Sequence, residues 1–253
     1  LLLAILFGAL IGSAILLAIH KNPLEVYGLL VRFNLTRADS IGSILYKATP
    51  LILAGLATAL SFRVNPFNIG VEGQYYIGAI AAANAGFAVT GLPRAIHLPL
   101  VLLVGVAGGM LWALLPIVLK LRRGAHEVIT TIMMNAIAGA LVLYLLEPGI
   151  LRDPAQAGTP RVRTPDVAPG AQIPSLLPLI HLLGLRVPES SRLNWLLLIG
   201  VALCVLFWWI LGRWRFGYEV RAVAQNPDAA EAACIGNQRI MFLMFILSGG
   251  VAG

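Results

Sequence analysis

Charged residues are scarce in this chain. Only 11% of its 253 residues are Asp, Glu, Lys or Arg, whereas a soluble domain usually carries roughly 25%. Hydrophobic residues make up 59% of the chain and gather in long runs. This combination excludes an ordinary soluble domain and indicates a membrane protein.

The patterns that mark catalytic and metal sites are absent from the sequence. Cys204 lies in an apolar run and Cys234 in a polar stretch, so these two cysteines have no metal-ligand spacing and predict no disulfide. No HExxH, GxSxG or GxxxxGKS/T motif occurs. We therefore expect no catalytic residue, no metal site, no cofactor and no ATP site in this chain.

The net charge of +7 is too small to favour nucleic acid as a partner. Most of the cations flank apolar runs, where they set the topology and contact lipid headgroups. Membrane lipid is therefore the expected surrounding of the chain.

Seven apolar segments predict an all-α fold, a polytopic transmembrane helix bundle in one domain over 1–253. A helix needs roughly 20 apolar residues to cross the hydrocarbon core. The segments cover about 1–19, 44–62, 74–92, 97–119, 127–146, 194–212 and 239–253. The first lacks a Met and a charged start, so a signal peptide is not expected. The last stops in mid-helix, so we expect a piece of a longer membrane protein, truncated at both ends.

Two basic clusters set the expected topology. They are Lys120, Arg122 and Arg123 after the fourth segment, and Arg213, Arg215 and Arg221 after the sixth. The positive-inside rule places both in the cytoplasm. The stretches 20–43 and 148–193 are then external loops, and 213–238 is a cytoplasmic loop. The loop 148–193 holds eight prolines, and its apolar part, 173–187, is too short to span.

The stretch 62–76, FRVNPFNIGVEGQYY, predicts a discontinuous helix near 63–74. Pro66, Gly70 and Gly73 cannot continue a regular helix cheaply. Irregular backbone at membrane depth is tolerated only where it is buried in protein or lines a cavity. Broken helices of this kind often build the substrate sites of transporters.

The candidate substrate pathway consists of polar side chains at the break and in the fifth segment. At the break these are Asn65, Asn68, Glu72 and Gln74, and in the fifth segment they are Thr131 and Asn135. Two interpretations stay open for each group. The break is either a wet cytoplasmic turn or a buried stretch, and the fifth segment either bonds its neighbours or lines a path. Glu127 lies near the cytoplasmic end, where we expect solvation.

The loop 213–238 predicts a short helix over 227–235. Asn226 is a good N-cap, Pro227 suits the first helical position, and Asp228 complements the helix dipole. Glu231, Ala232 and Ala233 continue the helix, and Gly236 supplies a left-handed residue to end it.

Three stretches together resemble the permease subunits of bacterial ABC importers. They are FNIGVEGQYYIGA (67–79), HEVITTIMMNAIA (126–138) and VRAVAQNPDAAEAACIGN (220–237), the last followed by LSGGVAG (247–253). The resemblance covers nearly the whole chain. The first two motifs are similar to the nucleoside branch, and the third is common to the related sugar and branched-chain amino-acid permeases.

The resemblance implies a multi-pass protein of the bacterial plasma (inner) membrane that moves a nucleoside or related polar solute and does no covalent chemistry. Its implied partners are a second permease subunit, identical or homologous, cytoplasmic ATPase subunits that carry ATP and Mg, and an external substrate-binding protein. The helix 227–235 would be the coupling helix that docks on the ATPase. Glu231, Ala232 and Ala233 match the EAA triplet of importer permeases, although Gly236 follows it one residue too early.

A self-contained transporter driven by an ion gradient is the alternative. It would need acidic residues well inside the spans, and Glu72 is the only candidate at a plausible depth.

Overall fold

The computed structural model describes residues 2–36, 38–156, 159, 162–182 and 193–253. Within them the chain is helical, with one isolated bridge between Ser175 and Asn194 and no strand, which confirms the all-α prediction. The helices are α1 (Leu2–Ala18), α2 (Pro23–Thr36), α3 (Ala38–Phe62), α4 (Val71–Ala88), α5 (Arg94–Arg123), α6 (Glu127–Leu145), α7 (Leu177–Leu182), α8 (Leu196–Arg213), α9 (Arg215–Gln225), α10 (Pro227–Ala232) and α11 (Asn237–Ala252). Two 3₁₀ turns, η1 (Pro154–Gln156) and η2 (Pro169–Ala171), lie between α6 and α7.

The chain forms two compact units. The first comprises Leu1–Ala48 and Ser175–Trp195, and the second comprises Thr49–Pro174 and Leu196–Gly253. The second unit holds most of the helices and both groups of predicted site residues.

In the first unit, α1 and α2 meet at a sharp bend of 117°. The Tyr27 hydroxyl of α2 donates to the Ala9 carbonyl of α1 at 3.0 Å. The prediction that 20–43 is a loop is wrong, because α2 occupies most of this stretch, and its external location stays a prediction. Asn22 starts this helix: its Oδ1 accepts from the Leu24 N–H at 3.0 Å, and Pro23 takes the first helical position.

A helix lies in each of the seven predicted apolar segments. Among the described residues, four helices are long and apolar enough to cross a membrane: Ser40–Phe62 within α3, then α5, α6 and α8. The bent pair of α1 and Pro23–Phe33 would make a fifth span. The remaining two helices, α4 and α11, are more polar or shorter, and α11 with 16 residues reaches only about 24 Å. That α4 and α11 also cross stays a prediction.

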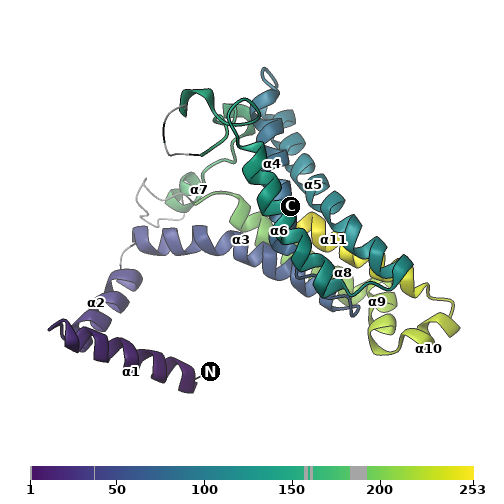
Figure 1. Cartoon of the computed structure of the whole chain (residues 1–253), viewed down its shortest axis with the longest axis horizontal. Coiled ribbons are helices and arrows are strands. Elements are labelled where there is room, and N and C mark those ends of the chain that lie inside the picture. Colours follow the sequence, from purple (N-terminus) through teal and green to yellow (C-terminus); the bar gives the residue numbers. More distant parts are fainter. Residues whose placement is uncertain (1, 37, 157–158, 160–161, 183–192) are drawn as a thin grey trace. The chain divides into compact units, whose positions relative to one another are not determined.

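Glycine lets α4, α5 and α11 approach one another closely (Figure 1). Gly105 and Gly109 of α5 form the GxxxG pair of the fourth segment. A Cβ on Gly109 would collide with the Gly249 carbonyl oxygen of α11, and a Cβ on Gly78 of α4 would collide with Gly253. Small residues at helix crossings let backbones pack by van der Waals contact where lipid supplies no hydrophobic drive. We call these residues of the three helices the glycine seam.

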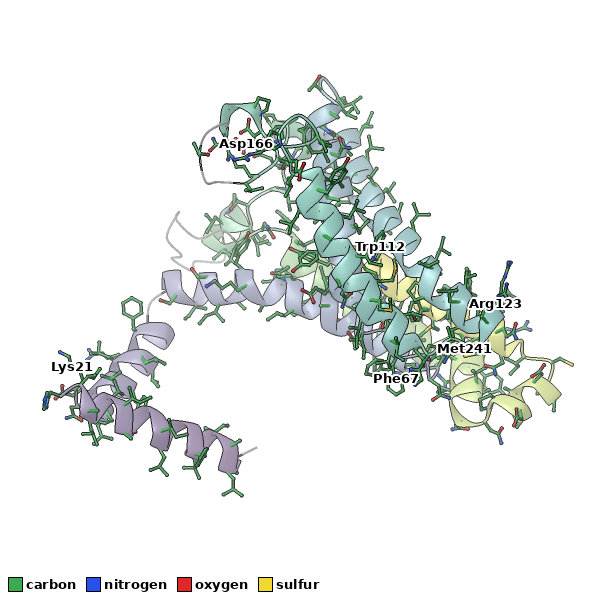
Figure 2. All side chains as sticks on the ribbon, in the orientation of Figure 1. Lys21, Phe67, Trp112, Arg123, Asp166 and Met241 are labelled. Atoms are coloured by element: carbon green, nitrogen blue, oxygen red, sulfur yellow. The ribbon has the colours of Figure 1, made fainter. Side chains whose placement is uncertain are left out.

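The described part of the loop after α6 covers one end of α4 and α5. The Ala168 N–H donates to the Gly86 carbonyl of α4 at 2.9 Å, and Arg94 of α5 donates to the Gln172 carbonyl at 2.9 Å. Gly170 of η2 packs beside the buried His97 ring. Asp166 therefore lies at one end of this unit, whereas Phe67, Arg123 and Met241 lie at the other (Figure 2). Residues 183–187 of the apolar stretch 173–187 lie outside the described residues.

The glycine seam predicts that Gly109→Ala destabilises the protein. An added methyl must push α5 away from α11, and overpacking of this kind typically costs about 1–3 kcal/mol. The measurement is the apparent unfolding temperature of the protein in detergent, which we expect to fall.

Gly139→Ala in α6 is the matched control, because a Cβ there meets no atom within 4 Å. Alanine is the better helix former, so this variant should be neutral or more stable. Equal unfolding temperatures for the two variants would contradict close packing at the seam.

Candidate functional site

The backbone break between α3 and α4 is held by a side chain from α6. Helix α4 starts at Val71 after Gly70, an N-cap with no side chain to accept the first free N–H groups. Asn135 of α6 takes that role: its Oδ1 accepts from the Gly73 N–H at 2.9 Å. Its Nδ2 donates to the Ile69 carbonyl, also at 2.9 Å. One amide thus satisfies a donor and an acceptor of the broken backbone.

A buried amide pair closes the break from the inside. Asn68 Nδ2 donates to Gln74 Oε1 at 2.9 Å, and Gln74 Nε2 donates back to Asn68 Oδ1 at 3.1 Å. Asn68 Oδ1 also accepts from the Gly70 N–H, and Asn68 Nδ2 donates to the Ser248 hydroxyl of α11 at 2.8 Å. Both amides are about 1% exposed. The break therefore has a buried side with internal hydrogen bonds, whereas Asn65, Phe67 and Ile69 on its other side are exposed.

Glu127 contacts protein groups at this site, and the prediction that water solvates its carboxylate is wrong. The side chain is buried at the start of α6. Its Oε2 accepts from Lys120 Nζ at 2.6 Å, across the turn at Gly124, and its Oε1 lies 3.4 Å from the Phe67 N–H. A carboxylate with little water needs such partners. Sequence reasoning missed the partner Lys120, although its spacing of seven residues across a glycine turn is a usable signal.

The six predicted pathway residues fall into two groups. Asn68 and Gln74 bond to each other, and Asn135 bonds the backbone of the same break. The buried Thr131 hydroxyl donates to the Glu127 carbonyl of its own helix at 2.7 Å. Asn65 and Glu72 instead have exposed side chains. Glu72 accepts a hydrogen bond from the Tyr76 hydroxyl at 3.0 Å on the same exposed face of α4.

The helix predicted at 227–235 is present as α10, three residues shorter. Asn226 caps it as expected, since its Oδ1 accepts from the Asp228 and Ala229 N–H groups at 3.1 Å. The C-terminal end of α10 differs from the prediction. Gly236 has a φ of −69° and is no left-handed residue, whereas Cys234 has a φ of 61°.

Cys234 ends α10 in a Schellman turn. The Ile235 N–H donates to the Ala230 carbonyl and the Cys234 N–H to the Glu231 carbonyl, both at 2.9 Å. A non-glycine residue in this conformation is uncommon, which is why the sequence pointed to the glycine two residues later. The turn leads directly into α11, which begins at Asn237.

The loop 213–238 also contains α9, which sequence reasoning missed. Its apolar residues recur at Phe216, Val220 and Val223, a helical spacing that could have revealed it. Val220 and Val223 are buried in one apolar cluster with residues of α3, the break, α8, α10 and α11. We call it the coupling cluster: Leu60, Val64, Leu211, Val220, Val223, Ala230, Ile240 and Met244.

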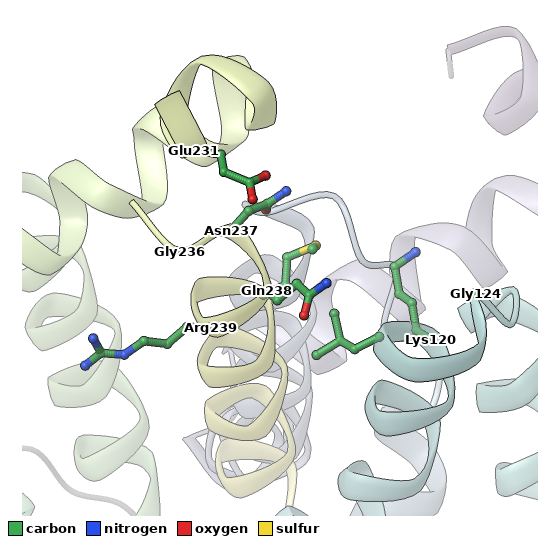
Figure 3. Close-up of a pocket in the computed structure, with 9 residues that line it drawn as sticks. Lys120, Gly124, Glu231, Gly236, Asn237, Gln238 and Arg239 are labelled. Carbon is green, nitrogen blue, oxygen red and sulfur yellow. The ribbon is translucent and has the colours of Figure 1, made fainter. Parts of the chain in front are cut away.

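A polar groove of about 500 Å³ lies beside the coupling cluster. Figure 3 shows Glu231 of α10 and the first residues of α11 on one side, with Lys120 and Gly124 on the other. No three His, Cys, Asp or Glu residues of the described part of the chain lie close enough together to hold a metal ion. The groove is lined by charged and amide groups, among them Lys120, Glu231 and Asn237.

Comparison with known proteins identifies a family over most of the chain. Residues 40–253 match the family described as "Branched-chain amino acid transport system / permease component". The chain is 34% identical over 252 residues to the guanosine ABC transporter permease protein of Bacillus subtilis, with all of this chain and 68% of the relative covered.

Two further relatives are equally informative. The glucose ABC transporter permease protein of Haloferax volcanii is 32% identical, with 99% of this chain and 64% of the relative covered. The nucleoside ABC transporter permease protein of Lactococcus lactis is 32% identical, with 100% of this chain and 67% of the relative covered. The chain thus spans about two thirds of the length of these relatives. No solved structure shows a significant match.

Asn135 holds the backbone of the break by two hydrogen bonds, which we call the clamp. We therefore expect Asn135→Ala to destabilise the protein. The Gly73 N–H and the Ile69 carbonyl would both lose their partner. Gly73 is buried, and an unsatisfied buried group costs about 1–3 kcal/mol. We expect a lower unfolding temperature in detergent and faster amide hydrogen exchange at Gly73.

Asn84→Ala, which removes an exposed amide from α4, is the control for this substitution. It should leave both measurements at their wild-type values. If Asn135→Ala also leaves amide exchange at Gly73 unchanged, the clamp does not hold the break.

Proposed function

The chain belongs to the branched-chain amino acid transport system / permease component family, and we propose that it is the permease subunit of an ABC importer that takes up a nucleoside. The family match is the observation that carries the proposal. The full-length similarity to the guanosine and nucleoside permeases supports the substrate class. The glucose permease of Haloferax volcanii, at a similar identity, makes a sugar the second candidate.

The substrate pathway in this proposal lies along the exposed face of α4, and a second permease subunit forms its other side. A carboxylate that faces lipid is costly, so Glu72 must meet water or protein in the assembled transporter. Tyr75 and Tyr76 lie beside it on this face. In the proposal, Glu72 accepts hydrogen bonds from the hydroxyls of a ribose or hexose, and the tyrosine rings stack on a nucleobase.

The other pathway residues keep the backbone in place in this proposal. The amides of Asn68, Gln74 and Asn135 already bond within the protein, so they shape the path instead of binding the ligand. Thr131 packs against Gly70 and fills the space behind the break. Asn65, at a φ of 72°, turns the chain out of α3.

The coupling helix α10 is the proposed contact with the ATPase. Asp228, Glu231 and Ala232 are exposed on it, whereas Ala230 anchors it in the coupling cluster. ATP binding would close the ATPase dimer, move α10, and rock the spans to change the side on which the cavity opens. An external binding protein would deliver the ligand to the opposite face. The chain itself supplies no ATPase site in this proposal.

Stimulation of ATP hydrolysis by the ligand tests the proposal. The full-length protein is co-purified with its ATPase, second permease and binding protein, and hydrolysis is measured with a panel of nucleosides, sugars and amino acids. We expect stimulation by nucleosides. Stimulation by sugars alone would show that the substrate is a sugar, the second candidate. A chain that binds no ATPase would overturn the permease role.

Glu231→Lys tests the coupling helix in the same assay. A reversed charge on the exposed face of α10 should weaken the ATPase contact, so nucleoside stimulation should fall about tenfold, within the range of typical coupling energies. Glu147→Lys, an exposed charge after α6, is the matched control. Equal stimulation in both variants would exclude Glu231 from the docking face.

A further inference from the structure

The hydroxyl of Ser248 in α11 bonds to groups outside its own helix. Its hydroxyl donates to the Ala57 carbonyl of α3 at 2.6 Å and accepts from Asn68 Nδ2 at 2.8 Å. Serine and threonine in helices usually donate to a carbonyl of their own helix. Ser61 and Thr131 do so here, at 3.0 and 2.7 Å. The fully buried Ser248 instead joins three elements: α3, the break and α11.

A second connection joins the same elements near the other end of α11. Val64, in the break, is buried in the coupling cluster against residues of α9, α10 and α11. Ala230 of α10 and Met244 of α11 belong to this cluster. The break is therefore tied to α10 by apolar packing at Val64, and to α11 by the hydrogen bond from Asn68 to Ser248.

The link from α10 to α11 is short and well defined. The Schellman turn at Cys234 fixes the end of α10, and α11 starts three residues later. The glycine seam then holds α11 against α5. Only residues 233–236 connect α10 to α11, so little chain lies between the two helices to absorb a displacement of α10.

We propose that Ser248 is a positioning residue that transmits movement of the coupling helix to the α3–α4 break. The hydroxyl holds Asn68 and the Ala57 carbonyl together, so that α11 and both sides of the break move as one body. Contiguous hydrogen-bonded and packed groups are the physical route by which two sites couple. This role rests on the proposed permease function. In it, the Ser248 hydroxyl transmits movement from the ATPase to the substrate pathway.

Ser248→Ala tests this role in the assembled complex with its ATPase, second permease and binding protein. Nucleoside uptake into liposomes and ATP hydrolysis are measured in the same samples, over a range of concentrations of nucleoside-loaded binding protein. We expect transport per ATP to fall about tenfold, within the range of typical coupling energies. The concentration of loaded binding protein that gives half-maximal hydrolysis should not change, because the external docking face is intact.

Ser61→Ala is the matched control. Ser61 is equally buried, but its hydroxyl bonds only within α3. The variant removes the same atom and should keep wild-type transport per ATP. If Ser248→Ala behaves like Ser61→Ala, the positioning role is wrong, whereas a wild-type complex without nucleoside-stimulated hydrolysis would overturn the permease function itself.

A loss of assembly in Ser248→Ala would call for Ser248→Cys. The thiol is close to the hydroxyl in size and is a weak donor and acceptor. We expect this variant to assemble, as judged by co-elution with the ATPase, and to show transport per ATP between the alanine variant and wild type. Full wild-type transport per ATP with the thiol, a weaker hydrogen-bond partner for Asn68, would contradict the proposal.

Discussion

A chain that interrupts a helix inside an apolar bundle must satisfy the freed N–H and C=O groups from its own side chains. This protein does so with Asn135, which caps α4 from a different helix, and with the Asn68–Gln74 pair behind the break. Other features follow from that requirement. Gly70 must be small to let Thr131 and the amides approach, and Glu127 is buried because it also reaches the backbone of the break at Phe67.

The same break connects the proposed substrate pathway with the proposed coupling region of the second unit. On one side it joins α4, whose exposed Glu72 and Tyr76 face the proposed pathway. On the other side Val64 enters the coupling cluster with α9, α10 and α11. The glycine seam keeps α4, α5 and α11 in close contact. A transporter that rocks rigid spans needs such a body, because packed interfaces move between discrete arrangements instead of deforming gradually.

Local signals in the sequence predicted a helix in each of the seven apolar segments and the start of α10, because capping by Asn226 and Pro227 depends only on neighbouring residues. The same Asn-Pro pattern at Asn22 starts α2, in a stretch that was predicted as the loop between two apolar segments. The end of α10 at Cys234 was not predictable, because no local sequence pattern identifies a non-glycine residue that adopts a left-handed conformation. The clamp of Gly73 by Asn135 spans 62 residues, and no local pattern states which backbone group a distant amide will meet. Burial of Asn68 was open in the sequence and needed the structure.

The central claim is that the break and the coupling region move as one body. Spin labels on Ile69→Cys beside the break and Gln238→Cys at the start of α11 measure it directly, in a chain whose own cysteines are replaced by Cys204→Ala and Cys234→Gly. Both labelled positions are exposed. We expect one narrow distance distribution that is the same in nucleotide-free and ATP-bound complexes. A shift or broadening between those two states, in a complex that still hydrolyses ATP on addition of ligand, would show that α11 moves independently of the break.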